Sequence, residues 1–357
     1  MLKRVVSALV VVPLFLVGDV GAGLAAPRNS FNVTNLVSDV PGRAQHLDPN
    51  LVNAWGLVAG PTSPWWVADN GTNVSTLYTG AGEAVPLVVS VEGAPTGMVF
   101  NGGPQFVVSD GTSSGPSVFM WVTESGTIRG WNPNVPPPAP STQSFLLVDR
   151  SGVGAIYKGL AIASTPSGDF LYANDFHNAR VDVFDGNFNL VTRPGAFVDP
   201  ELPSGFGPFG IQNIGGRIFV SYAKQDAEAE DEVAGQGLGF VDVFDTDGAF
   251  LGRVATRGQL NAPWGLALAP ASFGRFGGDL LVGNFGDGEI SAYEPQPDGT
   301  FEFVGQLRGP SRTVISIDGL WALQFGNGGR AGPTDTLFFT AGPDEESHGL
   351  FGKIEAG

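Results

Sequence analysis

The sequence predicts an all-β protein made of many short strands. Its 357 residues include 53 Gly and 27 Pro, and only 15% of them are charged. This composition favours tight turns over helices, and no long segment after the amino-terminal residues has helical periodicity. A short motif, in which a glycine follows a variable residue and precedes mostly aliphatic residues, occurs six times. Its glycine lies at positions 56, 97, 159, 210, 265 and 319. Repeats of this length are typical of a β-propeller, so we expect six blades.

Each motif marks the expected innermost strand of one blade. The clearest repeat has strands at 159–163, 170–174 and 180–184, separated by residues that favour turns. The six motifs begin at Trp55, Thr96, Lys158, Phe209, Trp264 and Asp318. The expected second strands are 65–68, 117–123, 170–173, 217–222, 279–283 and 336–340.

The expected outer strands are weaker, and the last blade has none of its own. Five blades have outer-strand candidates at 85–91, 144–148, 189–192, 250–254 and 301–306. After Asp318 the chain has room for only three strands. Residues 31–37, ahead of the first blade, have strand character, and an unpaired blade edge invites aggregation. We therefore predict that this segment completes the sixth blade and closes the ring.

Three segments do not fit the repeat and are expected to be surface loops or additions. The second blade contains an extra apolar run at 105–109 and a proline-rich loop at 135–140. The fourth blade contains an acidic insertion at 226–232, between its second and third strands. Insertions of this kind are tolerated at the surface and do not indicate a domain boundary.

The amino terminus has the pattern of a secretory signal peptide. Lys3 and Arg4 precede an apolar run at 5–17, and small residues follow as far as Ala26. Cleavage after Ala25 would leave residues 26–357 as a single propeller domain. The protein is then expected to be exported: secreted, or periplasmic in a Gram-negative source. An uncleaved anchor is the alternative, although the apolar run is short for a membrane span.

Charge and cysteine content exclude several classes of function. The chain has no cysteine, which rules out cysteine nucleophiles, zinc–thiolate sites and iron–sulfur clusters. Its formal net charge of −17 disfavours nucleic acid as a partner and favours cations or basic partners, although solubility explains the charge equally well. We expect a monomer with no membrane insertion after signal cleavage.

With its six repeats, the chain resembles propellers of the NHL-repeat and gluconolactonase-like superfamily. More closely, it resembles a family of exported bacterial propeller proteins with no established reaction. The segments that carry this closer resemblance are Asn35-Leu-Val-Ser-Asp-Val-Pro-Gly42, Leu47-Asp-Pro-Asn-Leu-Val-Asn-Ala-Trp-Gly56, Gly126-Thr-Ile-Arg-Gly-Trp131 and Tyr157-Lys-Gly-Leu-Ala161. The resemblance covers nearly the whole mature chain and implies the fold and export.

The superfamily also implies one candidate activity. Gluconolactonase-like enzymes hold a divalent cation on the propeller axis and hydrolyse lactones with it. In this chain Asn53 stands where their first-blade acid is expected, and an amide cannot act as a general base. Asp318, which precedes the expected innermost strand of the sixth blade, is the residue that would replace it.

Polar residues in the loops at one end of the blades are candidates for binding a cation. An Asn ends the second strand of three blades, at Asn70, Asn174 and Asn284, and Asp175 and Asp318 supply carboxylates nearby. Oxygen ligands of these types suit a hard cation, with Ca²⁺ the first expectation. The alternative is that Asn and Asp are there because tight turns require them.

Other residues on the same face are candidates for ligand contact. The three histidines, His46, His177 and His348, fall in these loops and could bind zinc or act as bases, or could be scattered surface residues. Aromatic rings near the axis could stack on a ligand or could pack between blades. The remaining candidates are Asn53, Trp55, Trp264 and Trp321.

The sequence thus predicts an exported binding or scaffold protein that uses an acidic, loop-rich face, with or without a bound divalent cation. The alternative is a metal-dependent hydrolase of the gluconolactonase-like type acting on a lactone or ester. The partner could be a small molecule, a glycan or a protein, and the sequence does not distinguish among them.

Overall fold

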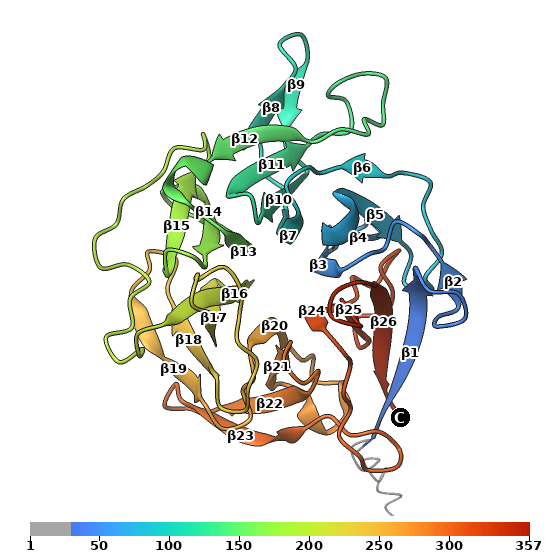
Figure 1. Cartoon of the computed structure of the whole chain (residues 1–357), viewed down its shortest axis with the longest axis vertical. Coiled ribbons are helices and arrows are strands. Elements are labelled where there is room, and N and C mark those ends of the chain that lie inside the picture. The colour runs from blue at the N-terminus through green and yellow to red at the C-terminus, as the bar shows by residue number, and fades with distance from the viewer. Residues whose placement is uncertain (1–29) are drawn as a thin grey trace, which may run out of the picture.

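The computed structural model describes residues 30–357, which form one ring of six blades around a central axis (Figure 1). The predicted signal peptide, residues 1–25, lies outside the described residues. The innermost strands β3, β7, β13, β16, β20 and β24 surround the axis, and each contacts the next around the ring. The predicted six-bladed propeller is confirmed. Within residues 30–357, no helix is long and apolar enough to cross a membrane.

The first two blades follow the predicted order, with one added hairpin in blade 2. Blade 1 consists of β3 (Ala54–Val58), β4 (Trp65–Asp69), β5 (Val74–Tyr78) and β6 (Val89–Ser90). Blade 2 consists of β7 (Pro95–Phe100), β10 (Phe119–Thr123), β11 (Thr127–Trp131) and β12 (Phe145–Asp149). The extra apolar run of blade 2 forms a separate hairpin of β8 (Val107–Ser109) and β9 (Ser114–Pro116).

Blade 3 has three strands: β13 (Tyr157–Thr165), β14 (Gly168–Asp175) and β15 (Arg180–Asp185). The prediction of an outer strand at 189–192 was wrong. That segment makes only a single bridge, between Leu190 and Phe184, because the chain turns away toward blade 4 through a loop containing Pro194.

The remaining blades complete the ring. Blade 4 consists of β16 (Phe206–Ile214), β17 (Arg217–Lys224), β18 (Gly239–Phe244) and β19 (Phe250–Thr256). Blade 5 consists of β20 (Pro263–Leu268), β21 (Leu280–Asn284), β22 (Ile290–Pro295) and β23 (Phe301–Gln306). Blade 6 consists of β24 (Leu320–Phe325), β25 (Leu337–Ala341), β26 (Leu350–Ala356) and β1 (Phe31–Ser38), with β2 (His46–Leu47) beyond them.

The amino-terminal strand closes the ring as predicted. β1 pairs antiparallel with β26, from Phe31 opposite Ala356 to Ser38 opposite Leu350. β2 then pairs parallel with β1. The two ends of the described chain therefore lie in one sheet, and blade 6 has the outer strand that its own sequence lacks.

The motif of blade 6 lies three residues later than predicted. In blade 1, Ala54 pairs with Asp69 and Leu57 with Val67. In blade 6, the corresponding pairs are Leu320 with Ala341 and Leu323 with Phe339. Trp321 and Ala322 therefore occupy the places of Trp55 and Gly56. Gly319 instead precedes β24 with a φ of +64°, a left-handed conformation that glycine adopts easily.

Glycine recurs in the motif because neighbouring innermost strands approach each other closely. A Cβ on Gly265 would lie 2.6 Å from the carbonyl oxygen of Trp321, the next motif along the ring. A Cβ on Gly210 would clash with the carbonyl oxygen of Trp264 in the same way. Because five of the six innermost strands have glycine at this position and the sixth has Ala322, the strands can converge closely on the axis.

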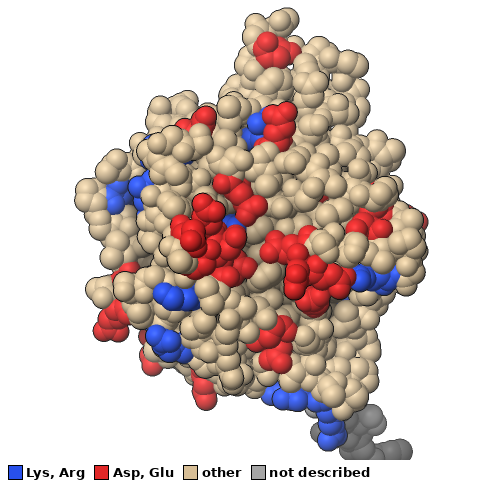
Figure 2. All heavy atoms as spheres, viewed as in Figure 1, with Lys and Arg blue, Asp and Glu red and all other residues tan. Residues whose placement is uncertain are grey.

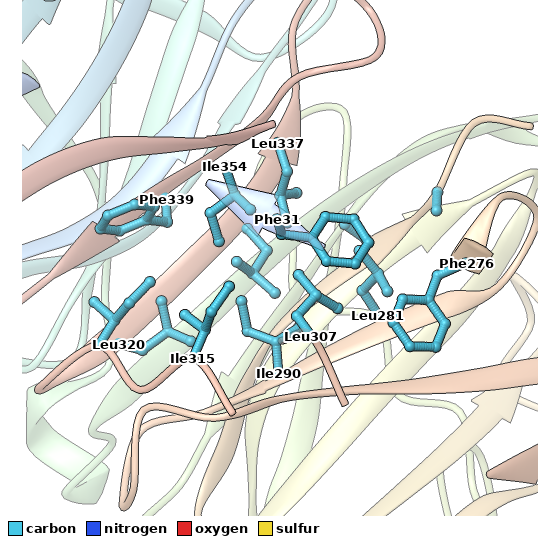
Figure 3. Packing of buried hydrophobic residues seen from close by; sticks show 14 of the residues in the cluster. Phe31, Phe276, Leu281, Ile290, Leu307, Ile315, Leu320, Leu337, Phe339 and Ile354 are labelled. Carbon is cyan, nitrogen blue, oxygen red and sulfur yellow. The ribbon is translucent and has the colours of Figure 1, made fainter. Parts of the chain in front are cut away.

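The hydrophobic core lies mostly between blades. The cluster between blades 5 and 6 contains residues of β21, β22, β24, β25 and β26 together with Phe31 of β1 (Figure 3). The Phe31 ring lies 5.0 Å from Phe273 and 5.8 Å from Phe276, measured between ring centroids. Ring closure therefore buries an aromatic side chain as well as pairing an edge.

We predict that Phe31→Ala lowers the free energy of unfolding by about 3–5 kcal/mol, because it leaves a cavity between two blades. Val33→Ala on the same strand is the control, since Val33 is 40% exposed, and it should change stability by less than about 0.5 kcal/mol. Equilibrium urea unfolding measures both. Equal effects of the two substitutions would contradict the proposed role of Phe31.

We predict that Gly210→Ala destabilises the ring by about 1–3 kcal/mol, because its new methyl group would overpack the contact with blade 5. Gly252→Ala, in β19, is the matched control, because a Cβ there meets nothing within 4 Å. Thermal unfolding of the two variants should separate them clearly. A neutral Gly210→Ala would show that neighbouring blades can move apart at no cost.

Candidate functional site

A stack of aromatic rings closes the axis near the starts of the innermost strands. The Trp55 and Trp321 rings stack with centroids 3.7 Å apart and an interplanar angle of 17°. Phe285 stacks on the other side of Trp321 at 4.1 Å. Trp264 and Phe209 meet Trp321 edge-on, at 6.0 and 5.8 Å. We call these five residues the aromatic plug.

The plug shows where the predicted tryptophans lie. Trp55 and Trp321 are almost fully buried, and Trp264 is partly buried, so the rings contact one another more than solvent. Trp264 donates its indole N–H to the carbonyl oxygen of Lys158 at 3.1 Å. The structure brings these three tryptophans together across the axis, where they pack against one another. The sequence left open whether they stack on a ligand or pack between blades, and the structure shows packing.

Above the plug, side chains from several blades form a hydrogen-bond network that passes through Asn53. The Asn53 carbonyl oxygen accepts the Trp321 indole N–H at 2.9 Å. The Asn53 amide nitrogen donates to Glu346 at 2.6 Å and to Asn70 at 3.2 Å. Asn70 donates to Glu124 at 2.9 Å. Both amide groups therefore use their oxygen and their nitrogen in hydrogen bonds to neighbouring side chains.

Lys158 extends this network to blades 3 and 4. Its side chain is 1% exposed, and its Nζ lies 2.5 Å from Glu124 and 3.1 Å from Asp231. The ammonium group also lies 5.2 Å from the centre of the Trp55 ring, within reach of a cation–π interaction. A buried ammonium needs such partners, because a charge without them is costly to remove from water.

The sequence contained a signal for Lys158 that our interpretation missed. The residue before the motif glycine is aromatic in blades 1, 4 and 5, and Trp321 occupies that place in blade 6. Lys158 is the charged residue at this position of the repeat. A charged residue where four of the six blades have an aromatic ring points to a buried partner of opposite charge.

The network surrounds a hollow of about 470 Å³ lined by Glu124, Ser125, Ile156, Glu230, Asp231 and Glu346. We call this hollow the mouth. Figure 2 shows Asp and Glu side chains gathered around the centre of this face of the ring. The acidic insertion of blade 4 supplies two of the lining residues. It lies at the surface, as predicted, but Lys158 also ties it to the axis through Asp231.

Burial and like charges shift the pKa values of the mouth. Burial alone would lower the pKa of the Lys158 ammonium, but Glu124, Glu232 and Asp231 together raise it above its ordinary value. Burial raises the pKa of Glu232 to about 8, against the opposing effect of Lys158. Burial also raises the pKa of Glu346, partly offset by the Asn53 hydrogen bond. At neutral pH Lys158 is therefore protonated, and burial keeps Glu232 largely in its neutral acid form.

The three asparagines predicted to bind a metal ion, Asn70, Asn174 and Asn284, do not occupy equivalent positions in their blades. Asn284 pairs with Pro263, and the corresponding pairs in blades 1 and 3 are Asp69 with Ala54 and Asp175 with Tyr157. Asn70 therefore lies one residue after this position and Asn174 one residue before it. Successive residues of a strand point to opposite faces, so the three amides do not form a ring around the axis.

Each predicted metal-binding residue has its own surroundings. Asn284 donates to the Gln259 carbonyl at 2.7 Å and to Asp287 at 3.1 Å. Asp175 accepts from Asn178 at 2.8 Å and pairs with Arg180. Asp318 accepts the Asp344 backbone N–H at 2.9 Å. Asn174 is fully buried beside Gly159, with neither end of its amide hydrogen-bonded to protein.

The predicted histidines lie in separate places. His348 pairs with Asp39 at 2.7 Å, His177 lies against Gly154 in blade 3, and His46 is exposed in β2. Among residues 30–357, no group of three or more His, Asp or Glu residues is arranged to hold a metal ion. Calcium binding through Asn and carbonyl oxygens stays a prediction.

Two relatives from Acanthamoeba polyphaga mimivirus show the family. Uncharacterised protein R648 is 34% identical over 339 residues, which cover 91% of this chain and 80% of the relative. Uncharacterised protein L690 is 34% identical over 346 residues, which cover 91% and 86%. The chain belongs to their family. These relatives are viral and do not support the expectation of an exported bacterial family. No protein-family model matches the chain.

Similarity to solved structures supports the fold. A catalytically inactive virginiamycin B lyase from Staphylococcus aureus with quinupristin has a TM-score of 0.51 at 11% identity, covering 91% of this chain and 99% of that chain. The soluble aldose sugar dehydrogenase from Escherichia coli has a TM-score of 0.52 at 11% identity, covering 92% and 100%. At 11% sequence identity, this similarity shows a shared propeller fold and nothing about function.

We predict that Glu232 makes stability fall as pH rises toward 8. Its raised pKa means that the fold prefers the protonated acid, so its contribution is full below the ordinary value of 4.5 and is lost as pH rises through about 8. The loss is at most about 1.4 kcal/mol per pH unit. Glu232→Gln should therefore lose less stability than the wild type between pH 6 and pH 8.5.

Urea unfolding at several pH values measures this difference. Glu302→Gln is the control, because Glu302 is exposed on β23, far along the chain from the mouth, and it should follow the wild-type profile. Parallel profiles for wild type and Glu232→Gln would show that Glu232 ionises as freely as in the unfolded chain.

Proposed function

We propose that the protein is a binding protein whose mouth receives a positively charged group of its partner. The observation that carries this proposal is the excess of carboxylates around one buried cation. Lys158 pairs with Glu124 and Asp231, while Glu230 and Glu346 also line the hollow. A partner ammonium or guanidinium group would form charge-assisted hydrogen bonds there.

The network supports binding because it holds these carboxylates in place before a partner arrives. Glu346 and Glu124 are each fixed by an amide from Asn53 or Asn70, and Asn53 is itself fixed by the Trp321 indole. Side chains that are already ordered lose less entropy on binding. The aromatic plug forms a rigid base beneath them.

The same contacts favour binding over hydrolysis. A lysine with a raised pKa stays protonated, so Lys158 is poorly suited to act as a base or nucleophile. Asn53 uses its amide in hydrogen bonds to Trp321, Asn70 and Glu346. Lys158 also supplies a positive charge between carboxylates, where a metal-dependent enzyme would place its ion.

The competing proposal is a metal-dependent hydrolase of the gluconolactonase-like type, acting on a lactone or ester. The observation in its favour is that Glu124 and Glu346 both line the mouth with carboxylate oxygen atoms, which are ligands that Ca²⁺ prefers. Export of the mature chain, which rests on the predicted signal peptide, is part of both proposals.

We predict that a tetralysine peptide binds the wild-type protein at low salt and that Glu346→Gln weakens this binding at least fivefold. The substitution removes one carboxylate charge from the mouth but keeps the side chain's size and its ability to accept from Asn53. Isothermal titration calorimetry measures the dissociation constants, which should also weaken as salt screens the charges. Glu302→Gln is the charge-matched control and should bind as the wild type does.

Three results would contradict the proposal: no tetralysine binding at low salt, equal binding of tetraglutamate, or an unchanged affinity in Glu346→Gln. Titration with CaCl2 tests the competing proposal in the same instrument. Calcium binding that requires Glu124 or Glu346, together with turnover of a lactone or ester, would favour the hydrolase.

A further inference from the structure

The opposite end of the axis has a second opening with different chemistry. The innermost strands run from the plug toward this end, where β3, β7, β13, β16 and β24 leave a hollow of about 250 Å³. Its lining includes Leu57, Met98, Phe100, Ile162, Gln212 and Gln324. We call this hollow the far opening. A narrow extension of about 30 Å³ continues along the axis as far as Trp264 of the plug.

The far opening is uncharged. None of the described residues that line the hollow or its narrow extension is an Asp, Glu, Lys or Arg. This is notable in a chain with a formal net charge of −17 and with carboxylates crowded at the mouth. The plug separates the two ends, so a ligand of the far opening is not selected by the charges of the mouth.

Two amide side chains in the far opening are available for a ligand. Gln212 and Gln324 are both partly exposed and line the hollow. Within the part of the chain that the structure describes, neither side-chain amide makes a hydrogen bond to protein. The neighbouring Asn213, in contrast, donates to the Ile162 carbonyl at 2.8 Å and accepts from the Gly216 N–H. An amide offers donors and an acceptor together, which matches hydroxyl groups that also do both.

The remaining lining adds an apolar surface to these amides. Phe100 is partly exposed, and Met98 and Leu57, which also line the hollow, are each 6% exposed. Pockets that combine apolar walls with a few polar groups are typical of small-molecule sites. A groove of about 480 Å³ shares Phe100, Ile162 and Asn213 with the far opening, and Asp169 also lines this outer part.

We propose that the far opening binds a neutral carbohydrate of one or two sugar units. The free amides of Gln212 and Gln324 would hydrogen-bond its hydroxyl groups, and Phe100 would contact its apolar C–H face. The lack of charged lining excludes anionic and cationic sugars from the inner hollow, because a charge there would lose its water without gaining a partner. The groove beside Ile162 gives room for a second unit.

Saturation-transfer NMR and calorimetry with D-glucose, D-galactose, maltose and lactose test this proposal on the full mature chain. We expect saturable binding of at least one of these sugars, with glucuronate and glucosamine binding at least tenfold more weakly. Gln212→Leu and Gln324→Leu keep the side-chain bulk but remove the donors and acceptors, and each should weaken binding at least tenfold. Gln143→Leu is the matched control, because Gln143 is exposed on blade 2, and it should leave binding unchanged.

Thermal unfolding checks that each variant is folded. If a leucine variant does not fold, Gln212→Asn or Gln324→Asn takes its place in the binding test, because the shorter side chain withdraws the amide from the ligand. Glu346→Gln at the mouth should leave sugar binding intact, so failure of the charge-based proposal and failure of this one are distinguishable. The proposal is overturned if none of the neutral sugars binds saturably, if the charged sugars bind as well as the neutral ones, or if both glutamine variants retain wild-type affinity.

Discussion

The structure depends on the pairing of its first strand with its last. Without β1, the outer edge of β26 would expose unpaired N–H and C=O groups, and Phe31 would leave the core between blades 5 and 6. The ring is also what places Trp55 of blade 1 against Trp321 of blade 6. The plug, and every contact that rests on it, therefore requires the two ends of the ring to meet.

The mouth uses this convergence to bury a charge. Six innermost strands reach the axis side by side, and five of the six blades supply side chains to one network around Asn53 and Lys158. A lysine in this position is stable only because carboxylates from neighbouring blades surround it. The same arrangement ties the acidic insertion of blade 4 to blade 2, so the insertion stabilises the site as well as lining it.

The two ends of the axis differ because different parts of the repeat face them. At the mouth, the loops between second and third strands carry Asp and Glu, and the plug seals the passage below them. At the far opening, the ends of the innermost strands carry apolar residues and free amides. One propeller thus has two openings whose linings differ in charge, and the aromatic plug lies between them.

Much of the fold was predictable from the sequence because its signals are local. Glycine in the motif, alternating apolar residues and turn-forming segments gave the six blades, and the missing outer strand of blade 6 pointed to residues 31–37. The register of blade 6 was harder, since Gly319 imitates the motif while Ala322 occupies its place in the ring.

The candidate site was less predictable, because it depends on distances across the ring. Asn53, Asn70 and the tryptophans were expected on the correct face, but whether Asn174 and Asn284 join them depends on strand register. The partners of Lys158 are 34 and 73 residues away in the sequence, at Glu124 and Asp231. The sequence by itself determined the number of blades and the closing strand, because these follow from local periodicity. Tertiary structure alone decided which charges meet at the axis, because six separate strands converge there only once the ring is closed.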